Sequence, residues 1–256
     1  MCCALASDGA NSSPTTTNGC GAHRLLSDVC HRAQLESRWR RHSCCAALYS
    51  PEGILLIDAG LPSLAPWLSM YTQRCILLTH YHMDHVQGLF PLRWGVGKPI
   101  PVYGPPDPAG CDDLFKHPGM LDFKPPLTAF QPLHLNRLRI TPVPLNHSRP
   151  TLGYLIETSE CRIAYLTDTV GLPDETLQFL EQQGTLDRLI IDCTEPPAAV
   201  MPRNHNDLTS ALHIHVRLRP QETYLTHIGH ALDVYLQTHV LPQGVHVARD
   251  GMSFTL

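Results

Sequence analysis

The sequence has little charge, few aromatic side chains and no long apolar run. Only 16% of its 256 residues are charged, the net charge is −4 and the pI is near 6.4. Nucleic-acid-binding domains usually have a clear basic excess, so this balance argues against a general nucleic-acid binder. No stretch approaches the roughly 18 consecutive apolar residues of a membrane span. Residues 1–8 lack the basic start and apolar core of a secretory signal. We therefore expect a soluble, cytoplasmic protein.

Histidine is what the sequence has in excess, with 16 residues, and there are 10 cysteines. An even cysteine count indicates disulfides mainly in small secreted proteins, so we do not expect a disulfide framework here. Residues 7–19 are rich in Ser, Thr, Asn and Gly and predict a loop. We find no internal repeat and no linker that divides the chain, and 43% apolar residues suffice for one large core. The sequence predicts a single domain over residues 1–256.

Short apolar runs that end in a metal-binding side chain recur from residue 54 onward. Continuous apolar runs of this length are typical of strands buried on both faces. If these strands finish together along one sheet, their terminal imidazoles and carboxylates meet in one cleft. The runs and the residues that end them are 54–57 with Asp58, 76–79 with His80, 141–146 with His147, 163–167 with Asp168, 189–191 with Asp192, and 224–226 with His227.

Helix-like stretches lie between these runs. Residues 174–183 place apolar side chains at helical spacing after an acidic start, and residues 208–217 and 232–241 are similar. Alternating strands and helices predict an α/β architecture with helices covering the sheet faces. Residues 99–132 are rich in proline, and we expect mostly loops and short helices there.

The densest group of metal-binding side chains lies between His80 and His85, directly after a predicted strand. Imidazoles two positions apart, as at His80 and His82, can converge on one ion. Asp84 and His85 then face a second position. Nitrogen with a hard oxygen is a ligand set suited to zinc, manganese or iron.

The remaining ligands must come from other strand ends. His147, Asp168 and His227 are the candidates, although each alone could be an ordinary residue at the end of a strand. Together the seven residues form a plausible site for two ions, which can share a hydroxide nucleophile and clamp a phosphoryl oxygen. One ion would be held by His80, His82 and His147, the other by Asp84, His85 and His227, with Asp168 bridging both.

The H-x-H-x-D-H stretch, followed by a lone His, a lone Asp and another His, resembles the metallo-β-lactamase-fold hydrolases. That resemblance implies an αββα four-layer sandwich, and it supports the assignment of ligands to ions. Longer passages resemble the PhnP family of cyclic phosphodiesterases within that fold, from about residue 35 to the end of the chain. These passages are residues 77–95, 101–106, 111–119, 144–148 and 202–205.

The resemblance implies hydrolysis of 5-phospho-α-D-ribosyl 1,2-cyclic phosphate to α-D-ribose 1,5-bisphosphate, in phosphonate catabolism by the carbon–phosphorus lyase pathway. It names His205 as the residue that acts beside the metals, and a histidine can protonate a leaving alkoxide at neutral pH. Two other functions stay open. One is a different phosphodiesterase, such as a tRNA 3′-processing nuclease, although the acidic net charge argues against it. The other is a metal-binding scaffold without catalysis.

The resemblance also implies manganese in the active site, with zinc as an alternative, and a homodimer that takes a small-molecule substrate and binds neither nucleic acid nor membrane. Family members hold a structural zinc on an N-terminal cysteine knuckle, which would fall at about residues 18–31. The knuckle pattern is altered here, so a rearranged zinc site and a lost site are both open. The rearranged site would use Cys20, His23, Cys30 and His230.

Three further features have less specific interpretations. We expect Asp58 to orient a ligating histidine rather than to bind metal. Asp192 also ends a strand but has no assigned role. The basic residues 38–41 are typical of a solvated surface, but with Arg203 they are also the candidates for holding the 5-phosphate.

Overall fold

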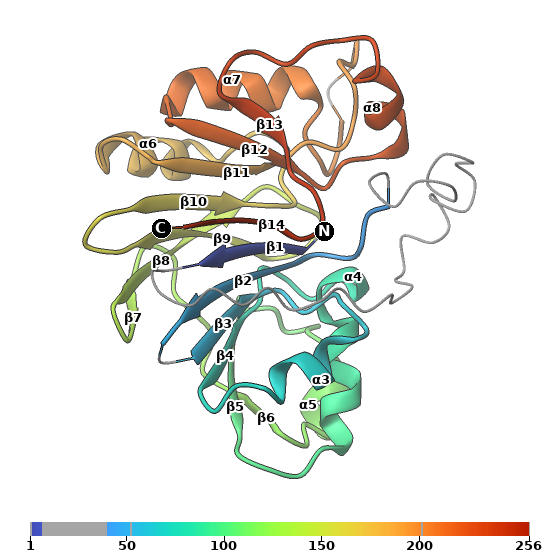
Figure 1. The fold of residues 1–256 in the computed structure, drawn as a ribbon, viewed down its shortest axis with the longest axis vertical. Coiled ribbons are helices and arrows are strands. Elements are labelled where there is room, and N and C mark those ends of the chain that lie inside the picture. Colours follow the sequence, from blue (N-terminus) through green and yellow to red (C-terminus); the bar gives the residue numbers. More distant parts are fainter. Residues whose placement is uncertain (1, 7–39, 52, 201, 256) are drawn as a thin grey trace. The chain divides into compact units, whose positions relative to one another are not determined.

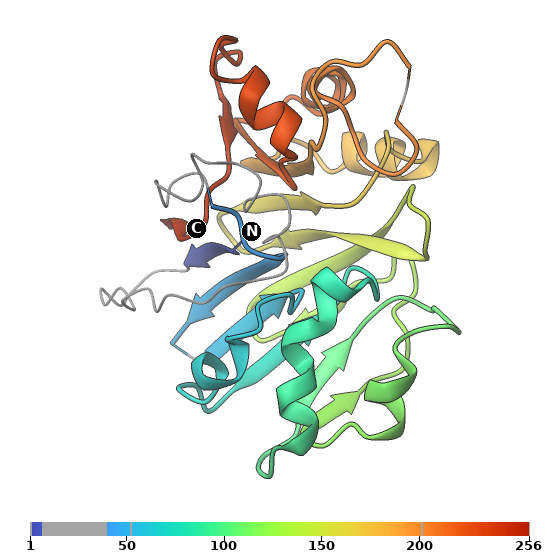
Figure 2. The same cartoon turned by 90° about the vertical axis from the view of Figure 1, so that its right-hand side faces the viewer.

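The structure is a computed structural model and describes residues 2–6, 40–51, 53–200 and 202–255 (Figure 1). The chain forms two compact units. The first unit comprises Met1–Pro126 and Arg249–Leu256, and the second comprises Leu127–Ala248. Each unit contains one seven-stranded sheet with its own helices, and the two sheets can be followed in Figure 2. The predicted α/β class is confirmed.

The sheet of the first unit has the strand order β14-β1-β2-β3-β4-β5-β6. Neighbouring strands are parallel except β2 and β3, which form an antiparallel pair. Its strands are β1 (Cys2–Ala6), β2 (Cys45–Ser50), β3 (Gly53–Ile57), β4 (Arg74–Leu77), β5 (Ile100–Tyr103), β6 (Leu121–Phe123) and β14 (Met252–Thr255).

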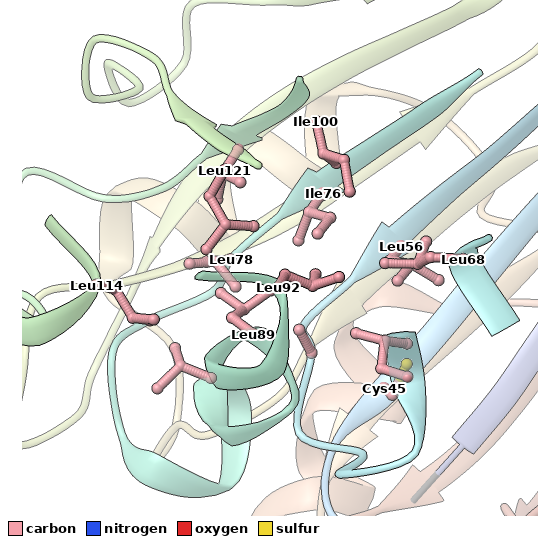
Figure 3. Packing of buried hydrophobic residues seen from close by; sticks show 14 of the residues in the cluster. Cys45, Leu56, Leu68, Ile76, Leu78, Leu89, Leu92, Ile100, Leu114 and Leu121 are labelled. Carbon is pink, nitrogen blue, oxygen red and sulfur yellow. The ribbon is translucent and has the colours of Figure 1, made fainter. Parts of the chain in front are cut away.

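The apolar core of the first unit lies on one face of this sheet (Figure 3). Alternate residues of a strand point to the same face, so Ile54 with Leu56, and Ile100 with Val102, enter the core together. Short helices supply the other side of the core through buried leucines such as Leu89. These helices are α3 (Leu64–Leu68), α4 (Met83–Val86), η2 (Gln87–Trp94) and α5 (Asp112–Lys116).

The sheet of the second unit has the order β13-β12-β11-β10-β9-β8-β7. It is parallel from β13 to β10 and antiparallel from β10 to β7. Its strands are β7 (Leu133–Leu135), β8 (Leu138–Leu145), β9 (Thr151–Glu157), β10 (Arg162–Leu166), β11 (Arg188–Asp192), β12 (Glu222–Thr226) and β13 (Val245–Val247).

Three helices belong to the second unit: α6 (Asp174–Gln182), α7 (Leu208–Leu218) and α8 (His230–Tyr235). Helix α6 packs against β8, and α7 packs against α6 and β11. The Asp207 carboxylate caps the start of α7 by accepting a hydrogen bond from the Ser210 amide at 2.8 Å. The helix ends at Arg219, whose φ of 47° is left-handed. Among helices of the described residues, none combines the length and apolar character that a bilayer span requires.

The structure adds to one expectation and corrects two. The proline-rich stretch contains two short strands, β5 and β6, besides the expected loops and the short helix α5; Pro101 lies within β5, and the other prolines lie outside both strands. Helix α8 ends at Tyr235 rather than Leu241, since turns and loop replace the helix from there on. The six strand ends belong to two sheets, not one: those at residues 58 and 80 lie in the first unit, and the other four lie in the second.

Candidate metal centre

Three polar residues just beyond strand ends have a left-handed backbone. Asp58 directly follows β3 with φ 62°, Asp168 lies shortly after β10 with φ 59°, and His227 directly follows β12 with φ 56°. Residues other than glycine rarely adopt this conformation, which costs on the order of 1–3 kcal/mol. Such strain persists where the surrounding contacts require it and is concentrated at functional sites. Both units therefore carry this feature at the ends of their central strands.

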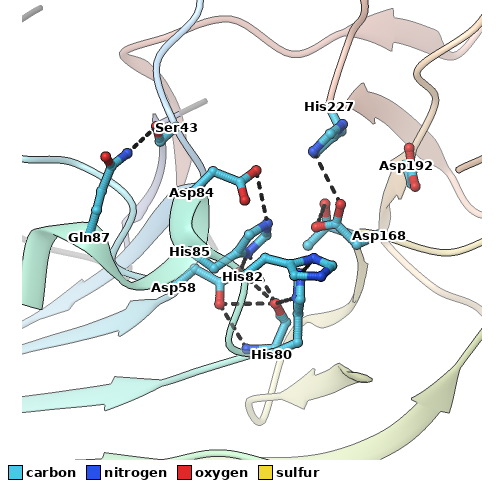
Figure 4. Close-up of polar contacts among 12 residues, drawn as sticks. Ser43, Asp58, His80, His82, Asp84, His85, Gln87, Asp168, Asp192 and His227 are labelled. Carbon is cyan, nitrogen blue, oxygen red and sulfur yellow. Dashed lines mark hydrogen bonds and ion pairs between the residues drawn. The ribbon is translucent and has the colours of Figure 1, made fainter. Parts of the chain in front are cut away.

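The first unit gathers four ligand-type residues after β4, which we call the histidine cluster: His80, His82, Asp84 and His85 (Figure 4). His80 Nε2 and His82 Nδ1 are 2.9 Å apart, and the ring centroids of His80 and His85 are 4.1 Å apart. His82 is the residue before α4, while Asp84 and His85 lie within that short helix. The turn into α4 thus brings side chains from neighbouring positions to one place.

Asp58 and Thr79 contact the rings of this cluster, and Asp58 can be seen beside it in Figure 4. The fully buried Asp58 carboxylate accepts hydrogen bonds from the Thr79 amide at 2.8 Å and from the Thr79 hydroxyl. It also lies 2.8 Å from His85 Nδ1, which leaves Nε2 as the nitrogen directed toward Asp84, 3.6 Å away. Asp58 thus contacts a histidine of the cluster, in agreement with the prediction that it orients one, whereas the contacts of Thr79 were not predicted.

The second unit gathers His147, Asp168, His205 and His227, which we call the strand-end cluster. His227 Nε2 lies 3.1 Å from Asp168 Oδ1, and His205 Nδ1 lies 3.4 Å from the same oxygen. The rings of His205 and His227 stack with centroids 4.4 Å apart, and His147 is 5.2 Å from His205. Four residues that are widely separated in sequence are therefore neighbours within this unit.

Asp192, which the sequence left without a role, holds His205. Its Oδ2 atom lies 2.8 Å from His205 Nδ1 and accepts a hydrogen bond from the Thr169 amide at 2.9 Å. Asp192 is fully buried at the end of β11. The signal in the sequence was the position itself, a carboxylate that closes an apolar run. What the sequence did not reveal was its partner.

The other two histidines of the strand-end cluster also have a partner for Nδ1. The Thr194 hydroxyl lies 3.0 Å from His227 Nδ1 and donates to the His227 carbonyl at 2.8 Å. His147 Nδ1 lies 3.0 Å from the Asn204 carbonyl oxygen. Since a carbonyl only accepts, Nδ1 of His147 carries the proton, and in the neutral ring the lone pair is on Nε2.

Burial sets the protonation preferences of these groups. Burial raises the pKa of the Asp58 carboxyl, although the His85 charge and the Thr79 hydrogen bonds oppose it. Burial likewise raises the pKa of Asp192, opposed by its contact with His205. For His147, burial lowers the pKa of the imidazole and so favours the neutral ring. A neutral imidazole is the form that binds a metal ion.

The donor set fits divalent transition metals. Histidines that bind metal usually present one nitrogen to the ion while a carboxylate, carbonyl or other oxygen holds the second. His85 with Asp58, His147 with the Asn204 carbonyl, and His227 with Thr194 all have this arrangement. Within each unit the predicted ligands lie close together, and these three histidines have one ring nitrogen held by an oxygen.

The predicted structural zinc site falls mostly outside the described residues. Cys20, His23 and Cys30 are not described, and the same holds for Arg38 of the basic stretch. His230 is the first residue of α8 and is exposed. Arg203 is exposed in the second unit, next to the segment that carries His205. The zinc knuckle and the phosphate contacts stay predictions.

Comparison with protein families identifies the architecture. Residues 55–228 match the model of the β-lactamase superfamily domain, a stretch that contains both clusters. One curated relative is a Ribonuclease Z of Methanopyrus kandleri, 30% identical over 114 residues, or 41% of this chain. The match spans 40% of the length of that relative.

Solved structures show the same fold. A diphosphatase from the PhnP family has a TM-score of 0.68 and 24% identity, covering 85% of each chain. Human tRNase Z, short form, has a TM-score of 0.62 and 19% identity, covering 83% of this chain and 92% of its own. The predicted metallo-β-lactamase fold is confirmed.

Proposed function

The chain belongs to the β-lactamase superfamily, and from that premise we propose that it is a metal-dependent cyclic phosphodiesterase. The proposed substrate is 5-phospho-α-D-ribosyl 1,2-cyclic phosphate, and the product is α-D-ribose 1,5-bisphosphate, in phosphonate catabolism. The observation that carries the proposal is the His205–Asp192 pair inside the strand-end cluster, 2.8 Å apart. A metal-binding scaffold would need the ligands but not an oriented imidazole beside them.

We assign seven of the clustered residues to two divalent ions, manganese first and zinc as the alternative. Asp168 would serve both ions. When bound, two divalent ions lower the pKa of a water molecule and neutralise charge on phosphoryl oxygens. The first ion would be held by His80, His82 and His147, and the second by Asp84, His85 and His227.

His205 acts on the departing oxygen of the sugar. Asp192 takes the hydrogen bond from Nδ1, so the proton on Nε2 is the one available for transfer. The stack with His227 restricts rotation of the His205 ring, which keeps Nε2 in one direction. Proton donation by His205 to the leaving alkoxide completes ring opening of the cyclic diester.

A second candidate is a tRNA 3′-processing nuclease. The Ribonuclease Z relative favours it, because that match is the one with 30% identity. The net charge of −4 opposes it, since little counterion release would drive RNA binding. We retain the small-molecule substrate and a homodimer as part of the first proposal.

Direct assay separates these functions. Purified protein with added Mn²⁺ is given the cyclic ribose phosphate, a precursor tRNA, and bis(p-nitrophenyl) phosphate in separate reactions. We expect turnover of the cyclic phosphate and of the generic diester, without tRNA cleavage. Cleavage of the tRNA alone would replace the first proposal with the second, and no turnover of any substrate at full metal occupancy would favour the scaffold.

Elemental analysis of the same preparation counts the ions. Two ions per chain agree with a lost zinc knuckle, and three agree with the rearranged site at Cys20, His23, Cys30 and His230. Fewer than two ions would contradict the proposed dinuclear centre.

A further inference from the structure

Cys44 lies beside the histidine cluster of the first unit and has no part in the proposed ligand set. Its side chain is 2% exposed, and its Sγ lies within 4.8 Å of a ring nitrogen of His85. The next residue, Cys45, belongs to the apolar core on the helix-covered face of the sheet, and Cys44 does not. The two thiols thus have different environments, one apolar and one next to a ligand-type imidazole.

The backbone fixes Cys44 in this place. The Gly60 amide donates to the Cys44 carbonyl at 2.8 Å, and the Ala59 amide donates to the His85 carbonyl at 2.8 Å. A Cβ atom on Gly60 would lie 1.9 Å from the Asp84 carbonyl oxygen and 2.7 Å from that of Cys44. The segment after Asp58 therefore joins the Cys44 backbone closely to that of the histidine cluster.

A side-chain hydrogen bond also fixes Ser43, the residue before Cys44. Gln87, at the start of η2, donates from Nε2 to the Ser43 hydroxyl at 2.7 Å (Figure 4). Ser43 is fully buried. Ser43 is thus bound to η2, which continues from the histidine cluster. The backbone of Cys44 is therefore held by two contacts, one at Ser43 and one at its own carbonyl.

From this arrangement we propose that Cys44 is a further ligand of the ion held by Asp84 and His85. The inference rests on the proposed dinuclear centre and adds a sulfur donor to it. On binding, the thiol releases its proton to solvent and the thiolate donates an electron pair to the ion. Thiolate is a soft ligand, so this position prefers zinc or cobalt to manganese. Under this proposal, the Cys44 side chain determines whether this ion site prefers zinc or manganese.

Cobalt substitution tests this ligand without reference to activity. The full chain is loaded with Co²⁺, and the near-ultraviolet thiolate-to-cobalt charge-transfer band is compared among the wild type, Cys44→Ser and Cys45→Ala. Cys45→Ala is the matched control, because it removes the neighbouring thiol, which lies in the apolar core. We expect the control to keep the wild-type band and Cys44→Ser to lose part of it. Thiols of a knuckle are present in all three proteins and cancel in the difference spectrum.

Competition between metals gives the second measurement. We expect Cys44→Ser to lower Zn²⁺ affinity at one site by about 10–100-fold or more, the loss found even for partners that only support a ligand. Mn²⁺ affinity changes less. Should Cys44→Ser fail to fold, Cys44→Ala replaces it, since alanine buries no hydroxyl.

The outcomes separate this inference from the proposed function. Two ions bound with identical cobalt spectra in all three proteins would overturn the role of Cys44 and leave the phosphodiesterase proposal intact. Failure of the wild type to bind ions would overturn both. A difference band confined to Cys44→Ser, in protein that hydrolyses none of the diesters, would support the ligand and reject the reaction.

Discussion

The two units present metal-binding side chains in different ways. In the first unit the four residues of the histidine cluster lie within six positions, 80–85, after one strand. In the second unit the strand-end cluster comes from four separate segments. One buried carboxylate, Asp58, supports the first arrangement through Thr79 and His85. In the second, His147, His205 and His227 each have a partner of their own for Nδ1.

This difference predicts how each unit responds to substitution. The histidine cluster depends on one residue, Asp58, so replacing Asp58 removes several contacts at once. In the strand-end cluster each histidine has its own partner, so replacing one partner affects one histidine. We therefore expect substitutions in the first unit to affect metal affinity and folding together, and substitutions around the strand-end cluster to separate chemistry from metal binding.

The largest expected effect is that of His205→Ala. We expect kcat to fall by roughly 10²–10⁴-fold, the usual contribution of a positioned general acid, while metal content stays at the wild-type level. Steady-state kinetics with elemental analysis on the same sample measures both. The control is His213→Ala, an exposed histidine on α7, which should leave both quantities unchanged. Metal-replete His205→Ala with wild-type kcat would remove His205 from the mechanism.

Asp58→Asn is expected to lower metal affinity by about 10–100-fold, because His85 loses the carboxylate that fixes its tautomer. Isothermal titration with Mn²⁺ measures the change. The counterpart in the second unit is Asp192→Asn, for which we expect a lower kcat with nearly unchanged affinity. If Asp58→Asn and Asp192→Asn lowered Mn²⁺ affinity equally, Asp192 would support metal binding as Asp58 does, and the expected difference between the two units would be wrong.

Substitution of one glycine in each unit should lower the free energy of unfolding by different amounts. Gly60→Ala brings a Cβ to 1.9 Å from the Asp84 carbonyl oxygen, and we expect a loss of about 3 kcal/mol or more, since backbone must move. Gly171, in the second unit, has φ +58° and open space around its Cβ position. Gly171→Ala therefore adds only backbone strain, about 1–2 kcal/mol. Urea unfolding measures both, and a milder effect at Gly60 than at Gly171 would contradict the close packing of the 58–60 segment.

The sequence was informative wherever one local pattern decided the outcome. The H-x-H-x-D-H stretch and the apolar runs that end at Asp58, Asp168 and His227 gave the ligand candidates, and the structure gathers them within their units. Hydrophobic period and length were enough to place most of the central strands. The left-handed backbone of Asp58, Asp168 and His227 was not predictable, because these residues are not glycine and the conformation is imposed by contacts with distant parts of the chain.

The sequence was uninformative wherever the partner lies far along the chain. No local pattern connects Thr194 with His227 or Asp192 with His205, since the pairing of β11 with β12 brings the first pair together. The division of the strands between two sheets was not predicted either, because strand pairing joins segments that are far apart in the sequence. The short helix α8 was overestimated because the apolar residues after Tyr235 continue its periodicity into a non-helical segment.

The smallest expected effect is a pH response that differs between the units. In the second unit burial lowers the pKa of His215, whose Nδ1 lies 2.8 Å from the Thr223 hydroxyl. The unfolded chain then takes up the proton first, so this contribution to stability is complete above about pH 6.5 and is lost as the pH falls toward the lower folded pKa. In the first unit burial alone would raise the pKa of Asp250, but the hydrogen bonds and charge of His42 outweigh it and lower the pKa. That contribution is present above about pH 3.9 and is lost only in stronger acid.

Acidification from pH 7.5 to 5 should thus weaken the second unit before the Asp250 contact of the first unit is affected. Hydrogen exchange resolved by peptide measures the two units separately, and the thermal midpoint should fall by roughly 1–3 °C from His215. His215→Gln keeps a side chain that can contact Thr223 but does not titrate, so it should remove this part of the pH dependence. Asp250→Asn, its counterpart, should leave the slope between pH 5 and 7.5 unchanged and remove only the loss in stronger acid. If His215→Gln kept the full wild-type slope, the early response of the second unit would belong to another group, and His215 on α7 would take up protons equally in the folded and unfolded chains over this range.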